Sequence, residues 1–148
     1  MRLWHYKLLQ FLPDAQFKGQ LRELVEIKRD WERKGNTNHL LINRVMQYTK
    51  SELYWYFTEY EDLYFERYGK HLTEYLHEFG RFGNYGDDSL DIKKPLYDGW
   101  HNKEYLRICM SNLAEKHIYG IGKSRITDEE WQRLCEGYKD ITGEDYVI

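Results

Sequence analysis

Apolar residues recur every three or four positions along most of the chain, which is the spacing of amphipathic helices. The longest such run covers residues 13–34. Pro13 fixes the backbone at its start, Asp14 is the expected N-cap, and Gly35 provides a left-handed stop. We therefore predict one long helix here, with its buried stripe at Phe17, Leu21, Leu24, Val25 and Trp31.

The same spacing predicts further helices downstream, each marked by residues that favour helix ends. The predicted helices start at Leu40, at Thr49 or Ser51, at Leu72, at Asn102 and at a capping box at residues 127–130. The second, third and fourth of them are expected to end at Gly69, Gly80 and Gly120. The helix from Leu40 should have about three turns. The tail, residues 140–148, shows no clear element.

Residues 81–99 fit no period and are rich in Gly, Asn and Asp. A connection of this length is unusual in a compact domain and is often functional, so we predict an irregular, functional loop at about residues 81–101. No stretch alternates as a strand does, and neither a repeat nor a linker is visible. The chain has 148 residues, which fits one domain. The prediction is an all-α, compact helical bundle with a single domain over residues 1–148.

Charge is distributed unevenly along the chain, although the net charge is only −3. Residues 1–50 carry ten Lys/Arg against five Asp/Glu, whereas residues 51–104 carry six against twelve. A basic first third is compatible with a surface that faces phosphates. Chance segregation of charge on helix surfaces is the open alternative. The 14 tyrosines are similarly ambiguous, because they can fill a core or line a wet groove.

Several classes of protein fit the sequence poorly. The first residues lack the apolar centre of a signal peptide, and no apolar run is long enough to span a membrane. Cys109 and Cys135 have neither metal-ligand nor disulfide-framework spacing. The six histidines form no zinc-protease pattern, and Gly122-Lys123-Ser124 lacks the upstream glycine of a phosphate-binding loop. We therefore expect a reduced, cytoplasmic protein, a monomer by default, without metal or cofactor.

The start of the chain carries the residue types of a Schiff-base site. An α-amine has a pKa near 7.7–8.0, so part of it is neutral at physiological pH and able to attack a sugar carbon. A carboxylate must then move protons, and cations must hold the flanking phosphates. Met1, Arg2, Arg22 and Glu23 supply these groups. Arg22 and Glu23 would lie about 100° apart on a helix, and the helical pattern by itself favours Glu23 as a boundary carboxylate beside a surface arginine.

The same residues carry a resemblance to a known family. Met1-Arg2-Leu3, the helix entry Leu12-Pro13-Asp14, and above all Leu21-Arg22-Glu23-Leu24 resemble the pyrimidine-dimer DNA glycosylase family of the endonuclease V type. The opening Met-Arg-Leu-Trp-His, followed by Gly19-Gln20-x-Arg22-Glu23, is similar to a bacterial subgroup of that family. The resemblance is strongest up to the end of the first long helix.

The resemblance implies a compact all-α enzyme whose N-terminus packs between helices and which needs no metal. It implies a DNA repair glycosylase with associated abasic-site lyase activity, acting on damaged double-stranded DNA such as pyrimidine dimers. The amine of Met1 would be the nucleophile and Glu23 its acid/base partner. Met1 should be retained, because the second residue is bulky. The predicted DNA contacts are Arg2, His5, Gln16, Lys18 and Arg22.

Some residues depart from the family pattern. Gln16 replaces a histidine, Glu26 stands where the best-known member has an arginine, and the tail at residues 144–148 is acidic instead of basic. These departures bear on which lesion is recognised more than on the amine chemistry. The candidates to compensate on the phosphate surface are Lys18, Lys28, Arg29 and Arg44. The alternative function is a non-catalytic helical module that binds nucleic acid or protein through a Tyr-rich groove.

Overall fold

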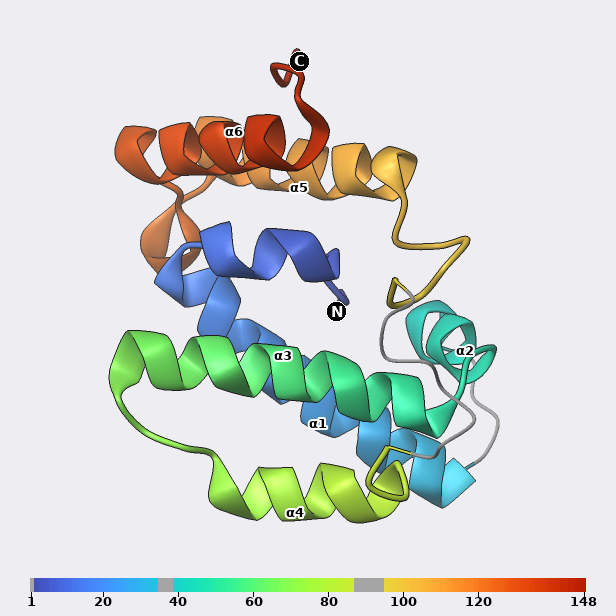
Figure 1. The fold of residues 1–148 in the computed structure, drawn as a ribbon. Coiled ribbons are helices and arrows are strands. Elements are labelled where there is room, and N and C mark those ends of the chain that lie inside the picture. The colour runs from blue at the N-terminus through green and yellow to red at the C-terminus, as the bar shows by residue number, and fades with distance from the viewer. Residues whose placement is uncertain (1, 35–38, 87–94) are drawn as a thin grey trace. The chain divides into compact units, whose positions relative to one another are not determined.

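The computed structural model describes residues 2–34, 39–86 and 95–148, and over these ranges the fold is all-α, as the sequence predicts. Figure 1 shows helices joined by turns and irregular segments, without a strand in the described ranges. None of the described helices is both long and apolar enough to cross a membrane. In chain order the elements are η1 (Tyr6–Phe11, 3-10), α1 (Asp14–Lys34), α2 (Leu40–Met46), α3 (Lys50–Tyr68), α4 (Thr73–Phe82), α5 (Lys103–Tyr119), η2 (Gly122–Ser124, 3-10) and α6 (Asp128–Thr142).

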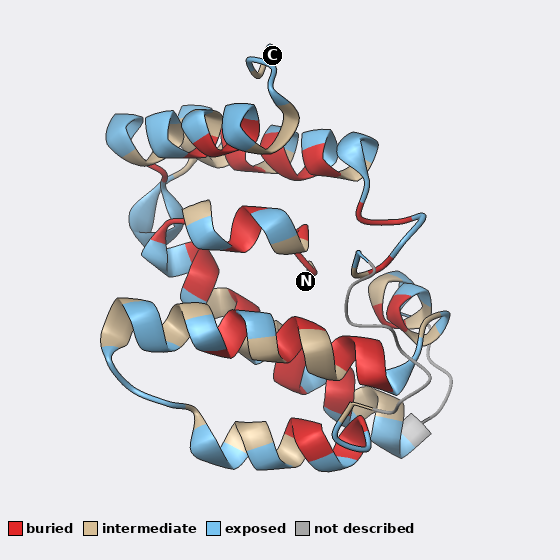
Figure 2. Cartoon of the chain, in the orientation of Figure 1, coloured by how far each residue is buried: buried red, intermediate tan, exposed pale blue. Residues whose placement is uncertain are grey.

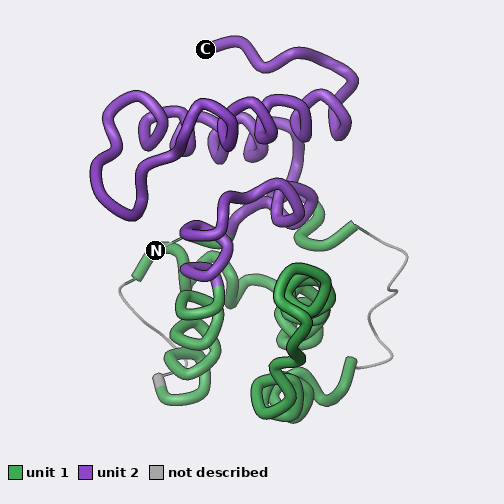
Figure 3. The backbone as a smooth tube through the Cα atoms, turned by 90° about the vertical axis from the view of Figure 1, so that its left-hand side faces the viewer, with its two compact units in different colours: residues 1–3, 21–98 green, residues 4–20, 99–148 purple. Residues whose placement is uncertain are grey.

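Two compact units make up the chain and are coloured separately in Figure 3. Unit 1 comprises residues 1–3 and 21–98, and unit 2 comprises residues 4–20 and 99–148. Helix α1 therefore contributes its first residues to unit 2 and its remainder to unit 1. The single-domain organisation stays a prediction.

The core of unit 1 forms on the inward faces of α1, α3 and α4 (Figure 2). Phe57 of α3 stacks flat on Phe79 of α4, with ring centroids 4.2 Å apart. Burying a large apolar side chain stabilises a fold by about 1.5–3 kcal/mol, so this aromatic contact is a main source of stability in the unit. The fully buried residues of α1 and α3 here are Leu24, Ile27, Leu53, Tyr56, Phe57 and Tyr60.

The core of unit 2 includes the short helix η1, which the sequence did not predict. Six residues are too few to display a helical period. Leu8 and Leu9 of η1 are nevertheless fully buried, and η1 lies against α6. Helices α5 and α6 also pack on each other. Their fully buried side chains include Cys109, Leu113, Leu134 and Tyr138.

Several predicted helix ends are confirmed. The side chains of Thr49 and Asn102 accept hydrogen bonds from N–H groups in the first turns of α3 and α5, at 3.1 and 2.9 Å. Thr127 forms a complete capping box with Glu130 at the start of α6. Each cap satisfies an N–H group that has no partner within the helix. Helix α3 ends at Gly69, which adopts the left-handed conformation with φ 68°.

Other predicted boundaries are wrong. Asp14 is the first residue of α1 and not its cap, and α2 ends at Met46, sooner than expected. Helix α6 continues to Thr142, into the tail for which no element was predicted. Gly80 lies inside α4 instead of ending it. A Cβ atom at Gly80 would lie 2.6 Å from the ring of Tyr85, so this glycine permits close packing and is not a helix stop.

Some predictions fall wholly or partly outside the described residues: those on Met1, on the Gly35 helix stop and on residues 87–94 of the predicted loop. The described end of that loop is anchored in unit 1. Tyr97 is fully buried, and its N–H donates to the Glu52 carboxylate at 2.5 Å.

Gly137 of α6 tests how tightly η1 packs. A Cβ atom at this position would overlap the ring of Phe11. We expect Gly137→Ala to lower the free energy of unfolding by about 1–2 kcal/mol, because overpacking outweighs the gain in helix propensity. Urea denaturation of the wild type, the single variants and the double variant Phe11→Leu/Gly137→Ala measures this. The smaller leucine should recover most of the loss, whereas additive losses would contradict the contact.

Candidate functional site

The residues before η1 are buried although they form no helix. Leu3, Trp4 and His5 are all buried, so the N–H groups of this segment need partners within the protein. Side chains supply them at alternate residues. The N–H of Trp4 donates to Gln20 Oε1 at 2.8 Å, and the N–H of Tyr6 donates to His101 Nδ1 at 3.2 Å.

The N–H of Arg2 is the third such group, and its partner is the carboxylate of Glu23 on α1. Glu23 is half-buried, at the boundary position that the helical pattern predicted. Burial raises the pKa of Glu23, while the Arg2 N–H and the positive charges of the N-terminal amine, Arg2 and Arg22 act in the opposite direction. The net pKa is raised, which favours proton exchange closer to neutral pH than for an ordinary glutamate.

Unit 1 thus brings together the predicted residues Arg2, Arg22 and Glu23. Arg2 is half-buried, and Arg22 is exposed on α1, as expected from its helical position. Both arginine charges act on Glu23. The predicted nucleophile, Met1, lies outside the described residues.

The other predicted DNA contacts belong to unit 2, and two of them are buried. His5 caps η1 by accepting from the N–H of Lys7 at 3.2 Å, and its ring stacks on His101 with centroids 5.1 Å apart. Burial lowers the pKa of His5 to about 4, so the ring is neutral at pH 7. The Gln16 side chain donates to the carbonyl of Ser124 at 3.0 Å. Lys18 alone of the three is exposed.

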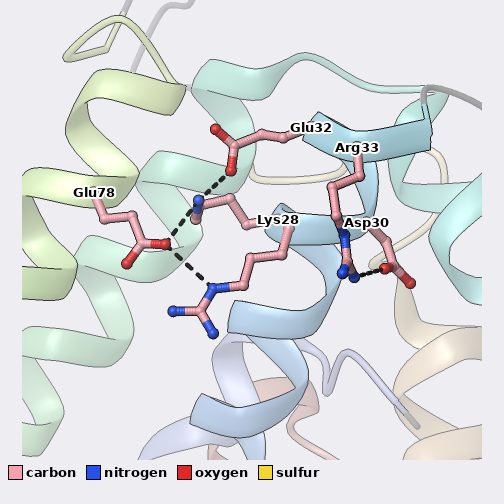
Figure 4. Close-up of polar contacts among 6 residues, drawn as sticks. Lys28, Asp30, Glu32, Arg33 and Glu78 are labelled. Carbon is pink, nitrogen blue, oxygen red and sulfur yellow. Dashed lines mark hydrogen bonds and ion pairs between the residues drawn. The ribbon is translucent and has the colours of Figure 1, made fainter.

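Lys28 is buried, so the prediction that it lies on the phosphate surface is wrong. It was a candidate for the phosphate surface, but it is 2% exposed. Figure 4 shows its ammonium between two carboxylates: it pairs with Glu32 one turn along α1 and lies 2.9 Å from Glu78 of α4. The i,i+4 spacing of Lys28 and Glu32 was the one available signal. Arg29, 3.5 Å from Glu78, also lies in this ion-pair network.

The same cluster borders an open pocket of about 530 Å³ in unit 1, lined by Lys28, Glu32, Glu74, Glu78, Arg81 and Phe82. Burial acts to raise the pKa of Glu78, but hydrogen bonds and charge from Lys28 and Arg29 outweigh it and lower that pKa. The lowered pKa keeps Glu78 ionised beside the buried Lys28 ammonium, which is the arrangement of a structural ion pair.

Comparison with protein-family models identifies the chain. Residues 1–78, just over half of the sequence, match the model described as pyrimidine dimer DNA glycosylase. The chain belongs to the pyrimidine dimer DNA glycosylase family. Searches of curated proteins and of solved structures give no significant match.

Membership of the pyrimidine dimer DNA glycosylase family implies a DNA repair enzyme with a DNA substrate. The matched range contains Arg2, Arg22 and Glu23, all of α1 to α3, and the beginning of α4. Helices α5 and α6 lie beyond it. The family match therefore covers the unit 1 cluster around Glu23 and leaves most of unit 2 outside.

The raised pKa of Glu23 predicts how Glu23→Gln affects stability. A folded-state pKa above the unfolded value means that the folded chain binds more protons, so this contribution is present at low pH and is lost as pH rises through the folded pKa. Glu23→Gln should therefore be more stable than wild type at pH 7, with a gain that shrinks towards pH 4. Urea denaturation at both pH values checks this.

Glu26→Gln, at an exposed position of the same helix, is the matched control and should show no such gain. The free energies of unfolding of Glu23→Gln and the wild type should differ by an amount that depends on pH. A difference that is the same at both pH values would contradict the idea that ionised Glu23 destabilises the fold.

Proposed function

We propose that the protein breaks a base–sugar bond at pyrimidine dimers in double-stranded DNA and cleaves the strand at the resulting abasic sugar, using the α-amine of Met1 and the carboxylate of Glu23. The observation that carries the proposal is the hydrogen bond from the Arg2 N–H to Glu23. That amide nitrogen belongs to the peptide bond that joins Met1 to Arg2. The carboxylate therefore contacts the residue that directly follows the proposed nucleophile in the chain.

The amine suits this chemistry without a metal. Its ordinary pKa near 7.7–8.0 leaves part of it neutral at physiological pH. The neutral amine attacks C1′ of the damaged nucleotide, and the bond from C1′ to the base breaks with its electron pair on the base. Opening of the sugar ring then leaves an imine between C1′ and the amine nitrogen. One amine proton ends on the base, which stays bonded to its partner pyrimidine, and the other ends on the ring oxygen.

Glu23 is proposed to carry protons in these steps. A half-buried carboxylate with a raised pKa is easier to protonate near neutral pH than an exposed one. In its ionised form it can take the C2′ proton once the imine has made that proton acidic. The C3′–O bond then breaks, and the 3′ phosphate leaves with the electron pair. Water finally hydrolyses the imine and regenerates the amine.

Arg2 and Arg22 are proposed to hold phosphates next to the reacting sugar. Contacts to phosphate fix the register of a protein on DNA without reading its sequence. Exposing the sugar requires local unstacking of the duplex, at a cost of a few kcal/mol. The two arginines can offset part of that cost, and their presence predicts an affinity that falls with salt.

A non-catalytic binding module is the alternative function. The Tyr-rich groove that would support it receives little support from the structure. The aromatic excess suggested a Tyr-rich groove, but Tyr56, Tyr60, Tyr97 and Tyr138 are all fully buried. These side chains fill the cores of the two units and do not line an open surface.

Glu23→Gln separates the two functions. For the enzyme, the substitution should lower the rate of strand cleavage on abasic duplex by about 100-fold or more, because it removes acid/base catalysis. Gel-based kinetics with a labelled duplex measure this. Glu26→Gln is the control and should cleave like wild type. A binding module would show no cleavage in any of these proteins.

Borohydride trapping tests the nucleophile directly. Reduction of the imine should give a covalent protein–DNA adduct, and peptide mass mapping should locate it on Met1 of the untagged protein. One extra residue before Met1 should abolish the adduct while circular dichroism and thermal unfolding stay unchanged. An adduct that maps to a lysine would overturn the proposed role of the amine.

A further inference from the structure

The connection between α5 and α6 presents unusually exposed apolar side chains. Tyr119 is 79% exposed and Ile121 is 85% exposed, and both lie in what we name the 119–125 segment. It contains the Gly122-Lys123-Ser124 triplet, which here forms the short helix η2. This part of unit 2 lies beyond the residues that match the family model.

Main-chain hydrogen bonds close the base of this segment. The carbonyl of Lys116 accepts from the N–H of Gly120 at 3.1 Å and from the N–H of Ile126 at 3.3 Å. A Cβ atom at Gly120 would overlap that carbonyl and lie 3.1 Å from the Cα of Arg125. Only glycine allows the two ends of the segment to approach so closely.

Two further contacts hold the segment within unit 2. The side chain of Ile126 is fully buried at one end. Near the same end, the side-chain amide of Gln16, which is itself only 8% exposed, donates to the carbonyl of Ser124. The exposed apolar side chains therefore stand on a backbone that is held at both ends, so they are not simply part of a frayed end.

The charged side chains of residues 116–127 all have one sign, although carboxylates flank this range at Glu115 and at residues 128–130. Residues 116–127 contain Lys116, Lys123 and Arg125 but no Asp or Glu, in a chain with a net charge of −3. Lys123 and Arg125 are both exposed. The nearest carboxylate along the chain on the α6 side, Asp128, lies 2.8 Å from His117. An exposed apolar tip with cationic neighbours complements a polyanion that also offers apolar surface.

We propose that the 119–125 segment is a DNA-binding element, with Lys123 and Arg125 on phosphates and with Tyr119 and Ile121 inserted into the minor groove. The choice of DNA as occupant rests on the proposed function and on charge complementarity. Apolar side chains inserted from the minor groove part neighbouring base pairs and bend the duplex, and cations hold the flanking backbone. A repair enzyme that must unstack its substrate has a use for such a wedge.

The cationic half of the proposal is tested by salt dependence. Binding to a duplex with a tetrahydrofuran abasic-site analogue is measured by fluorescence anisotropy at several salt concentrations. Lys123→Ala/Arg125→Ala should bind about tenfold more weakly, and the slope of log K against log salt should become less steep by about 1.8, or 0.9 per phosphate contact.

The matched control is Lys103→Ala/Lys139→Ala, which removes the same charge from the same unit. Lys103 and Lys139 lie beside the acidic residues Glu144 and Asp145. This control should bind like wild type with an unchanged slope. If both double variants weaken DNA binding equally, the loss reflects only the net charge of the protein. That result would overturn the proposal.

The apolar half is tested by Tyr119→Ser/Ile121→Ser, which should weaken binding about tenfold without changing the salt slope. Val147→Ser/Ile148→Ser removes comparably exposed apolar residues from unit 2 and should have no effect. Thermal unfolding checks that each variant is folded, which is expected because all substituted side chains are exposed. If Tyr119→Ser/Ile121→Ser loses binding to phosphatidylserine vesicles but keeps its DNA affinity, the segment binds membranes. That result would contradict the proposal.

The binding test examines the 119–125 segment and the trapping test examines the lyase, so either proposal can fail while the other stands. Anisotropy requires no chemistry, so affinity that depends on the segment without a borohydride adduct would overturn the lyase and keep the DNA-binding element. An adduct on Met1, with affinity that is the same in wild type and both segment variants, would keep the lyase and overturn the element.

Discussion

Burial of the first residues without a helix is the constraint on which the site depends. A buried N–H group without a partner costs about 1–3 kcal/mol, so such a segment is stable only where side chains accept its hydrogen bonds. Gln20 does this for Trp4, His101 for Tyr6, and Glu23 for Arg2. Chain ends usually fray unless they are tied down. Here the requirement to satisfy the backbone also brings a carboxylate to the start of the chain.

The hydrogen bonds of this segment have very different ranges in sequence. Gln20 and Glu23 lie on the first long helix, within the residues that match the family model. His101 lies far beyond them, 95 residues from Tyr6, and its ring also stacks on His5. The part of unit 2 outside the family match therefore helps to hold the start of the chain. It has a structural role in addition to any contact with DNA.

Local features of the fold could be predicted from the sequence because their causes are local. Thr49, Asn102 and Thr127 cap helices that begin at the next residue, so only a few neighbours decide each outcome. The half-burial of Glu23 followed from its position beside the apolar stripe of α1. The family resemblance then gave that residue a chemical meaning that the helical pattern alone did not supply.

Contacts between distant elements could not be predicted in this way. Lys28 looked like a surface cation, because nothing near it in sequence reveals Glu78 on another helix. His5 and Gln16 looked like DNA contacts, yet the structure buries both. Gly80 looked like a helix stop because glycine often ends helices, but it is needed to make space for the ring of Tyr85 from the following turn. In each case the partner is set by packing, which the pattern of a single helix does not contain.

Half-burial of Glu23 links stability and chemistry in the proposed site. A fully exposed glutamate would keep an ordinary pKa, and one buried without cations would stay protonated over a wide pH range. At Glu23, burial raises the pKa while the Arg2 N–H and nearby positive charges limit that rise. A group that must both take and give protons needs this balance, because each role uses a different protonation state. The unfavourable ionised form is thus consistent with a residue retained for proton transfer and not for stability.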